Sequence, residues 1–505
     1  MAQRNLRFSY SDPQRMDDRV WQTAYITGME GIPWQCHHRL QGDQFIIGRE
    51  LDESGKLNIV WTTAAHGNLC LSTSSLPIVD KPYDLCVEIA RGTVGRLKSQ
   101  TADWQRMGLR LPENFFPLAE AGTRDFLRAV THRGDPSQRE QLAQSAIDQS
   151  IQASTNLCGA FAQQALMSRK STEGPLTTLL GASLPAEFQQ DDTRWSLLSA
   201  FNTLGIQPDL GRVEQASGQA NFTLFDAQVA RALDMQMKLC IGPLVDFRSS
   251  KLPRWMILLD EDPQSILRAA CAHADTTVKR YKGQAHVWNC AAGLNSPNQQ
   301  KWSDEQVLRM AVALIETVRT ADDRTPVLLT VEQPWSEYLR DDSDGISPLQ
   351  FADALIRADL GLSGIALELN FDLWPGGSFP RDLIEVNRML DRWTMLGLPL
   401  LIYVSSPTQV AAAGQRDRVS QWKTAVQSAQ FAAGEQPAAT EQQRVIPPEL
   451  LVQLLLSKPS VHAVVWHQLS DQYPVATQSS GLWDATGQTK DLLQKLSQLR
   501  QSFLL

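Results

Sequence analysis

The sequence lacks the features that mark several classes of protein. Its seven cysteines are an odd number without a CxxC pair, which argues against a disulfide framework and a structural zinc site. It has no glycine-rich phosphate loop and no metal-ligand spacing, so we expect no cofactor. No run approaches the length of a membrane-spanning helix, and the first residues lack the apolar core of a signal peptide. A net charge of −8 gives no reason to expect nucleic acid or an anionic membrane as a partner.

The composition is that of a large globular protein from a reducing compartment. Of the 505 residues, 43% are hydrophobic and 20% are charged, which is typical of soluble proteins and sufficient for more than one domain. We therefore expect a cytoplasmic protein with more than one domain. Fourteen tryptophans are the unusual feature. Many belong in a core, but flat indole rings also stack on the faces of sugars.

Residues 1–82 are predicted to form a small β-rich module. The predicted strands cover residues 20–27, 43–49, 57–62 and 68–73, with turn-prone segments between them. Short strands at this spacing are typical of a small sandwich or half-barrel. Such a module in a carbohydrate enzyme either binds glycans or packs against the main domain, and the sequence leaves both alternatives open.

Residues 83–175 are predicted to be a helical connector, because the period of the apolar residues changes there. Asp135 is suited to cap a helix whose first turn contains Pro136. The charged segment 168–175 is predicted to be a linker. The helical patterns cover residues 85–104, 115–130 and 138–166.

Residues 176–505 alternate between predicted strands and helices. Eight strands separated mostly by helical patterns indicate an α/β fold, the (β/α)8 or TIM barrel. A polar segment near residues 405–445, rich in alanine and glutamine, is predicted to be an insertion after the seventh strand. The predicted strands cover residues 179–184, 200–206, 238–247, 285–290, 327–332, 364–370, 398–404 and 461–468.

Two glutamates stand at or near the ends of neighbouring predicted strands. Alternation puts Glu332 on the same face as Leu328 and Thr330, and Glu368 on the same face as Ala366. The strand–helix–strand order predicts a parallel pair, so both glutamates would meet at the C-terminal rim, where barrel enzymes carry their active sites. The alternative is that each glutamate pairs with a basic residue near its strand end.

Three stretches resemble the family-10 glycoside hydrolases, the xylanase-type retaining enzymes. They occur in the order of that family, over about residues 181–496. The resemblance implies a barrel that acts on or binds a poly- or oligosaccharide in a cleft at its C-terminal face, with a carbohydrate as partner. The stretches are 242–255 with Leu-Pro-Arg-Trp, 280–289 with Tyr-Lys-Gly and Trp-Asn, and 461–471 with the following turn at 481–488.

The residues that the resemblance implies for catalysis are absent from the aligned positions. The acid/base glutamate should follow Trp288-Asn289, where this chain has Cys290-Ala291-Ala292-Gly293. The nucleophile should close the seventh strand, which contains no carboxylate, and the histidine expected near Asp246-Phe247-Arg248 is missing. Retaining hydrolysis needs two carboxyl groups about 5 Å apart. The xylanase mechanism therefore cannot operate as the family runs it.

Two hypotheses follow for the function. In the first, the chemistry has moved, and Glu332 and Glu368 are the catalytic pair of a glycoside hydrolase, because parallel strands lie about 4.8 Å apart. In the second, activity is lost and the protein is a carbohydrate-binding pseudoenzyme or scaffold. A third class, a barrel enzyme with other chemistry, has no motif in its favour. Two carboxylates converging in an open cleft would indicate catalysis, whereas glutamates each locked to an arginine would indicate its loss.

The predicted substrate-binding residues lie at or beyond strand ends. They offer rings for stacking, carboxylates, or hydrogen bonds to hydroxyl groups. For each tryptophan the alternative is a core residue or a plug of the barrel mouth. The residues are Asp246, Trp288, Asn289, Gln333, Trp335, Asn370, Asp372, Trp374, Tyr403 and Trp466.

Overall fold

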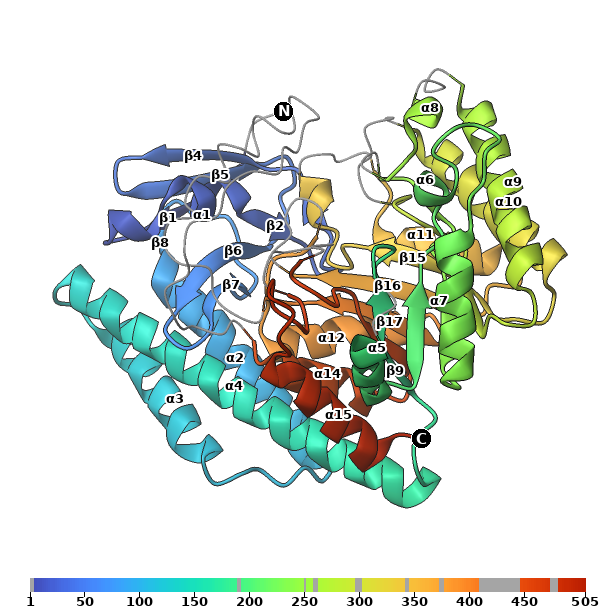
Figure 1. Ribbon diagram of the computed structural model, residues 1–505. Coiled ribbons are helices and arrows are strands. Elements are labelled where there is room, and N and C mark those ends of the chain that lie inside the picture. Colours follow the sequence, from blue (N-terminus) through green and yellow to red (C-terminus); the bar gives the residue numbers. More distant parts are fainter. Residues whose placement is uncertain are drawn as a thin grey trace.

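The computed structural model describes residues 4–188, 192–248, 251–257, 262–295, 302–340, 345–371, 377–407, 446–472 and 480–505. Figure 1 shows two small sheets and three long helices on one side of the molecule and a barrel on the other. The predicted insertion near residues 405–445 lies, from residue 408 onward, outside the described residues.

The N-terminal strands form two four-stranded sheets. The first has the order β4-β5-β1-β8 and the second the order β3-β2-β6-β7. The strands of the first sheet are β1 (Arg4–Ser9), β4 (His37–Gln41), β5 (Gln44–Arg49) and β8 (Tyr83–Asp84). Those of the second are β2 (Tyr25–Thr27), β3 (Pro33–Trp34), β6 (Lys56–Thr63) and β7 (Gly67–Ser72).

The strand predicted over residues 20–27 is wrong for most of its length. A short 3-10 helix, η1 (Pro13–Arg15), precedes α1 (Asp18–Thr23), and only β2 is extended. The Asp17 side chain caps α1, accepting a hydrogen bond from the Val20 N–H at 3.0 Å. An acidic cap favours a helical turn here over the strand that the apolar residues suggest.

Three helices lie beside the N-terminal sheets and pack on one another: α2 (Leu85–Arg106), α3 (Phe115–Thr131) and α4 (Pro136–Glu173) (Figure 1). Asp135 caps α4 as predicted, accepting from the Ser137 N–H at 3.0 Å. The predicted linker at 168–175 is instead mostly the last turn and a half of α4. Arg169 stabilises this end, since it pairs with Glu173 at 3.2 Å and donates to the Leu456 carbonyl at 2.9 Å.

The predicted barrel is confirmed by the strand pairing. Eight parallel strands close in the order β9-β10-β11-β13-β15-β16-β17-β18. A short pair, β12 (Val245–Asp246) and β14 (Ala291–Ala292), extends the third and fourth strands. The barrel strands are β9 (Leu179–Leu184), β10 (Thr203–Ile206), β11 (Lys238–Ile241), β13 (Val287–Asn289), β15 (Val327–Glu332), β16 (Gly364–Asn370), β17 (Leu400–Ser405) and β18 (Val461–Trp466).

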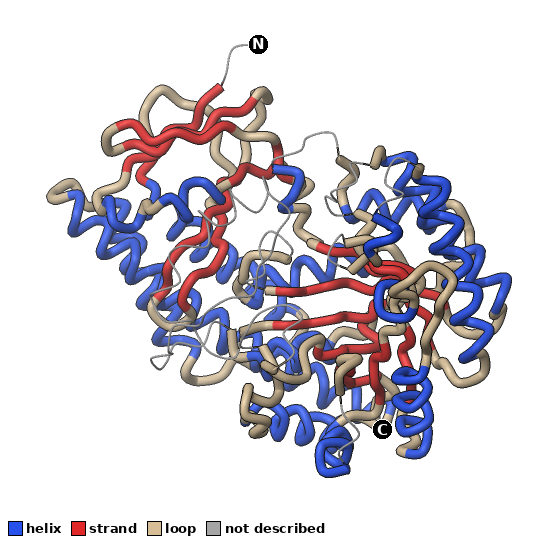
Figure 2. The backbone as a smooth tube through the Cα atoms, turned by 45° about the horizontal axis from the view of Figure 1, so that its top comes forward, coloured by secondary structure: helices blue, strands red, loops and turns tan. Residues whose placement is uncertain are grey.

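Helices surround the barrel strands, as Figure 2 shows. Capping boxes begin two of them, Ser303 with Gln306 and Ser347 with Gln350. Within the described ranges, none of the helices combines the length and the hydropathy that crossing a membrane requires. The described helices of the barrel region are α5 (Asp192–Leu197), η2 (Leu198–Ala200), α6 (Leu210–Val213), α7 (Thr223–Asp234), α8 (Arg254–Ile257), α9 (Pro263–Tyr281), α10 (Asp304–Ala321), η3 (Glu337–Arg340), α11 (Pro348–Arg357), α12 (Leu383–Thr394), α14 (Pro448–Ser457) and α15 (Asp491–Phe503).

Alternation along the strands sorts the barrel side chains into two layers. The outward set, which includes Val327, Leu329 and Val331, packs under the helices in the main core. The inward set forms a separate cluster inside the barrel, as predicted for Leu328 and Ala366. The members of this inner cluster are Cys240, Leu328, Ala366, Leu401, Tyr403, Ala463 and Val465.

The second N-terminal sheet is bound to the barrel directly. The Cys70 N–H donates to the Pro380 carbonyl at 2.7 Å, and Arg381 Nη2 donates to Tyr25 Oη at 2.5 Å. Tyr25, Val60, Cys70 and Phe379 form a small buried apolar cluster at this contact. The N-terminal sheet and the barrel therefore share a buried contact, and the contact does not mark where one domain ends. The domain limits at residues 82 and 175 stay a prediction.

Candidate functional site

The two glutamates that the sequence singled out are direct neighbours in the barrel. β15 and β16 pair in parallel from Leu328 opposite Gly364 to Glu332 opposite Glu368. Alternation turns both glutamate side chains inward, on the side of the inner cluster. Glu332 closes its strand and Glu368 lies two residues before the end of the next, so both carboxyl groups lie at the C-terminal rim.

One arginine connects this pair to a third carboxylate. Arg248 Nε donates to Asp246 Oδ1 at 2.8 Å, and its Nη2 donates to Asp246 Oδ2 at 2.6 Å. Its Nη1 donates to both oxygens of Glu368, at 3.0 and 3.1 Å. We call Asp246, Arg248, Glu332 and Glu368 the rim cluster. A single guanidinium group therefore holds two of its three carboxylates.

The environment of the rim cluster shifts the pKa values of Asp246 and Glu332 in opposite directions. Burial opposes ionisation of Asp246, yet its pKa is lowered because Arg248 is in direct contact with it. Burial, followed by repulsion from Glu368, raises the pKa of Glu332 to about 8, although Arg248 and the Gly293 N–H oppose this shift. Glu332 thus carries its proton at neutral pH, while Asp246 is ionised.

Glu332 is fixed in place but keeps one oxygen without a partner. The Gly293 N–H donates to Glu332 Oε1 at 2.5 Å. The Asn295 side chain forms two hydrogen bonds with the Glu332 backbone, both at 2.9 Å: Oδ1 accepts from the N–H and Nδ2 donates to the carbonyl. Glu332 Oε2 is buried and has no hydrogen-bond partner in the part of the chain that the structure describes. A proton on this oxygen has no acceptor among the described residues.

Gly293 is required for this arrangement. Its φ is 75°, in the left-handed region, and a Cβ there would lie 2.7 Å from the Arg248 backbone nitrogen. Only glycine brings the N–H this close to Glu332 without displacing Arg248.

Glu368 is held more completely than Glu332. Besides its two bonds from Arg248, it accepts from Asn370 Nδ2 at 2.5 Å, and His467 Nδ1 lies 3.4 Å from Oε1. Asn370 is itself oriented by Ser405, whose hydroxyl donates to Asn370 Oδ1 at 2.9 Å. Burial lowers the pKa of His467, although Glu368 opposes the shift. The carboxylate of Glu368 is therefore enclosed by donors.

Two further predicted residues lie near the glutamates inside the barrel. Tyr403 lies opposite Glu368 in the pairing of β16 with β17, and burial raises its pKa. Asn289 donates to Thr330 Oγ1 at 2.7 Å inside the barrel. The structure thus brings together Asp246, Asn289, Glu332, Glu368, Asn370 and Tyr403 from the residues that the sequence indicated.

Two of the predicted tryptophans lie on the opposite side of the barrel wall. Trp288 and Trp466 are 0% and 1% exposed and pack in the main core. Trp288 Nε1 donates to Asp322 Oδ2 at 3.0 Å, and Trp466 Nε1 donates to the Ser480 carbonyl at 2.8 Å. Alternation is the cause, because each is adjacent to an inward residue and so points outward. These two rings cannot stack on a sugar, and their proposed role is withdrawn.

Of the remaining predicted residues, one follows Glu332, one lies away from the rim cluster and two lie outside the described chain. Gln333 is buried and has a left-handed φ of 46°, where the chain leaves β15. Trp335 lies toward the N-terminal sheets, with the Arg381 guanidinium 4.7 Å from its ring centre. Asp372 and Trp374 lie outside the described residues.

The sequence interpretation missed several residues of the site, above all Arg248 and His467. Arg248 follows Asp246 by two positions, the spacing that places side chains on one face of an extended chain. His467 directly follows the outward-facing Trp466 and so returns to the inner side. The backbone contribution of Gly293 has no comparable signal in the sequence, because it depends on how the loop after β14 folds.

Solvent reaches the rim cluster mainly through Arg248. The side chain of Arg248 is 27% exposed, whereas Asp246, Glu332 and Glu368 are 5%, 2% and 4% exposed. Within the described ranges, no group of three or more His, Cys, Asp or Glu side chains is placed to hold a metal ion. In the rim cluster the cation between the carboxylates is Arg248 itself.

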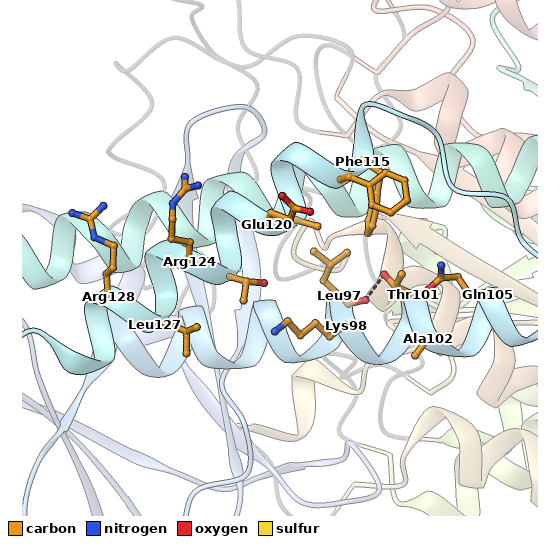
Figure 3. A pocket seen from close by; sticks show the side chains of 13 residues that line it. Leu97, Lys98, Thr101, Ala102, Gln105, Phe115, Glu120, Arg124, Leu127 and Arg128 are labelled. Carbon is orange, nitrogen blue, oxygen red and sulfur yellow. Dashed lines mark hydrogen bonds between the residues drawn. The ribbon is translucent and has the colours of Figure 1, made fainter.

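Three cavities lie away from the rim cluster. One of about 580 Å³ is a groove between α2 and α3, where Leu97 and Lys98 face Phe115 and Leu127 (Figure 3). A second, of about 570 Å³, lies at the opposite end of the barrel, beside Leu179. The third, of about 360 Å³, lies between the second N-terminal sheet, α2 and α12.

Comparison with known proteins finds similar folds among solved structures. Native xylanase 10B from Thermotoga maritima is 14% identical over 68% of this chain and 97% of its own, with a TM-score of 0.46. GH10 from Paenibacillus barcinonensis is 15% identical over 68% and 97%, with a TM-score of 0.48. Xylanase B from Clostridium stercorarium F9 is 15% identical over 63% and 96%, with a TM-score of 0.46. No protein-family model matches the chain, and no curated protein matches it in sequence.

Proposed function

We propose that the C-terminal face of the barrel binds a carbohydrate without hydrolysing it by the two-carboxylate route. The observation that carries this proposal is the double attachment of Arg248 to Asp246 and Glu368. It leaves Glu332 as the carboxyl group of the rim cluster with an unpartnered oxygen among the described residues. Support for a carbohydrate ligand comes from the sequence motifs at the third, fourth and eighth strands.

A retaining hydrolase needs a carboxylate that can attack the sugar and a second that donates a proton, about 5 Å away. Both oxygens of Glu368 already accept from Arg248, and Oε1 also accepts from Asn370. Hydrogen bonds to charged groups stabilise by about 1.5–3 kcal/mol each. An attack by Glu368 would break such bonds and leave Arg248 without a counter-charge, so this carboxylate is a poor nucleophile.

The same arrangement suits binding. The protonated Glu332 Oε2 can donate to a sugar hydroxyl, and the exposed part of Arg248 offers further donors. Since Gly293 and Asn295 fix Glu332 before any ligand arrives, little conformational freedom is lost when the hydrogen bond forms.

A relocated hydrolase is the second candidate, and one observation favours it. A pKa of about 8 makes Glu332 a suitable general acid near neutral pH. Glu368, its direct neighbour across the strand pair, would then be the nucleophile or base.

The test combines binding and turnover on the same neutral oligosaccharides, beginning with xylo-oligosaccharides. We expect binding by titration calorimetry and no reducing sugar released in prolonged incubation. Glu332→Ala should weaken binding about tenfold, whereas Glu332→Gln, which keeps a donor, should stay within about threefold of the parent. Glu305→Gln, an exposed carboxylate on α10, is the matched control and should change nothing.

The outcomes separate the candidates. Turnover that both Glu332→Gln and Glu368→Gln abolish would establish the relocated hydrolase. If a broad panel of glycosides shows neither binding nor turnover, the carbohydrate proposal fails.

A further inference from the structure

The cavity between the second N-terminal sheet, α2 and α12 is strongly basic. Five cationic side chains and one carboxylate line it, and we call these six residues the interface pocket: Lys56, Arg96, Arg381, Glu385, Arg388 and Arg392. Four of them follow one another at intervals of three or four residues at and along α12, which places them on one side of that helix.

The cations of the interface pocket fall into two groups. Arg381 is paired with Glu337 at 2.5 Å, and Arg96 donates to Ser72 at 2.6 and 2.7 Å. Lys56, Arg388 and Arg392 form no ion pair or side-chain hydrogen bond with other residues of the described chain. Three cations without partners therefore face the single carboxylate of Glu385.

The titration of the lining groups reflects this surplus of positive charge. Burial opposes ionisation of Glu385, but its pKa is lowered by the surrounding arginines, with Arg381 and Arg96 foremost. Partial burial and the nearby guanidinium groups lower the pKa of Lys56, although Glu385 opposes the shift. An anion entering the pocket would relieve the repulsion among these cations.

Arg381 supplies an independent indication of a ligand. It lines the pocket and is only 2% exposed, yet its Nε has no hydrogen-bond partner among the described residues. Buried N–H groups almost always have an acceptor, so an unpaired one calls for an explanation.

We propose that the interface pocket binds a small molecule bearing a tetrahedral oxyanion ester, a phosphate or a sulfate group. Guanidinium groups recognise such oxyanions with paired, charge-assisted hydrogen bonds. The hydroxyl groups of Ser72, Ser74 and Ser75 on the pocket wall suit the neutral part of the ligand. The volume of about 360 Å³ is at the small end of ligand pockets and fits a body the size of one sugar ring. This proposal stands independently of the one for the barrel rim.

Titration calorimetry with four probes tests the chemistry: glucose 6-phosphate, glucose 6-sulfate, glucose and inorganic phosphate. We expect both esters to bind, the tighter one identifying the natural group, and glucose to bind at least about tenfold more weakly, since it makes no charge-assisted bond. Affinity for the esters should also fall as sodium chloride is raised, because salt screens the pocket.

Variants separate a binding role from a structural one. Arg388→Gln with Arg392→Gln should weaken ester binding about 100-fold, because each substitution removes a charge-assisted hydrogen bond that is worth about a factor of ten. Glu385→Gln removes the opposing carboxylate and should tighten binding several-fold, a gain that damage to the fold cannot produce. Arg268→Gln, an exposed arginine on α9, is the control and should leave affinity unchanged.

The proposal is overturned if the esters bind no better than glucose. It is also overturned if their affinity is unaffected by the double arginine variant, or if inorganic phosphate binds while both esters are excluded.

Discussion

The rim cluster and the interface pocket both gather charged side chains, but they balance charge in opposite ways. In the rim cluster one guanidinium group bonds two of the three carboxyl groups, and each carboxyl group is at most 5% exposed. Five cations and one carboxylate line the interface pocket. Arg381 is paired with Glu337 and Arg96 lies 3.8 Å from Asp382, whereas Arg388 and Arg392 form no ion pair with the described residues and are partly exposed.

The difference indicates what each group of charges does for the protein. Charges that are buried and paired contribute to stability only as long as the pair is complete, because a lone buried charge is costly. Charges that are unpaired and reached by solvent contribute little to folding and remain available to a ligand. Stability and ligand affinity should therefore respond to different substitutions in the two places.

The largest effect is expected for Arg248→Leu. It leaves Asp246 and Glu368 buried without their counter-charge, and we expect the free energy of unfolding to fall by about 3–5 kcal/mol. Urea unfolding followed by tryptophan fluorescence measures this, with Arg268→Gln as a control expected to stay within about 0.5 kcal/mol of the parent. A loss below about 1 kcal/mol would mean that water already solvates these carboxylates.

A loss of about 3 kcal/mol is expected for Glu337→Gln. Glu337 is the fully buried partner of Arg381, so the substitution leaves a charged guanidinium without an anion. The amide still accepts a hydrogen bond, which keeps the loss near the lower end of the range for buried pairs. Glu305→Gln, on the exposed face of α10, should be neutral in the same unfolding assay. Equal stabilities of the two variants would contradict the contrast between paired and open charges.

A smaller effect is expected from pH, through Glu332. Its pKa is about 8 in the folded protein, against an ordinary 4.5. Between these values the folded state binds more protons than the unfolded state, so the free energy of unfolding falls as the pH rises. The contribution is fully present below pH 4.5 and is lost as the pH passes 8. Between pH 5 and 7 the loss is about 2.5 kcal/mol, since the slope is about 1.4 kcal/mol per pH unit at most.

Glu332→Gln removes this titration. Urea unfolding at pH 5, 6, 7 and 8 should give a flatter profile for the variant than for the parent. Parallel profiles would show that Glu332 titrates alike in both states.

The smallest effect is expected for the pair Arg388→Gln and Arg392→Gln. Because neither arginine forms an ion pair with the described residues, the free energy of unfolding should change by less than about 0.5 kcal/mol. In the absence of ligand the free energy of unfolding should rise slightly, since the repulsion between these arginines and Lys56 is relieved. A loss above about 1.5 kcal/mol would make this side of the pocket structural and remove the contrast with the rim cluster.

Much of the barrel could be predicted from the chain alone. β15 and β16 begin and end where their apolar runs do, because a strand buried on both sides leaves a clear apolar pattern. The third predicted strand, over 238–247, is instead two short strands, β11 and β12, since Gly242 and Pro243 interrupt it. Alternation alone could also have excluded Trp288 and Trp466, which are adjacent to inward-facing residues.

The partners of the glutamates could not be predicted in the same way. That Arg248 turns back from the third strand to reach Glu368, 120 residues later in the sequence, depends on the path of a loop. The same holds for Gly293, whose contribution is a backbone N–H that any residue type would carry. The interface pocket brings Lys56 and Arg96 to α12 only when the N-terminal sheet is packed on the barrel, and no local pattern encodes that contact.

The contact between Tyr25 and Arg381 joins residues that are 356 positions apart. At about 5–20 residues per second, a ribosome delivers Arg381 roughly 20–70 s after Tyr25. During this interval neither Arg381 nor the Pro380 carbonyl, which later bonds the Cys70 N–H, exists to cover the sheet. The contacts of Tyr25 and Cys70 with the barrel can therefore form only after Pro380 and Arg381 have been synthesised. Covering this part of the N-terminal sheet is a late event in the synthesis of the chain.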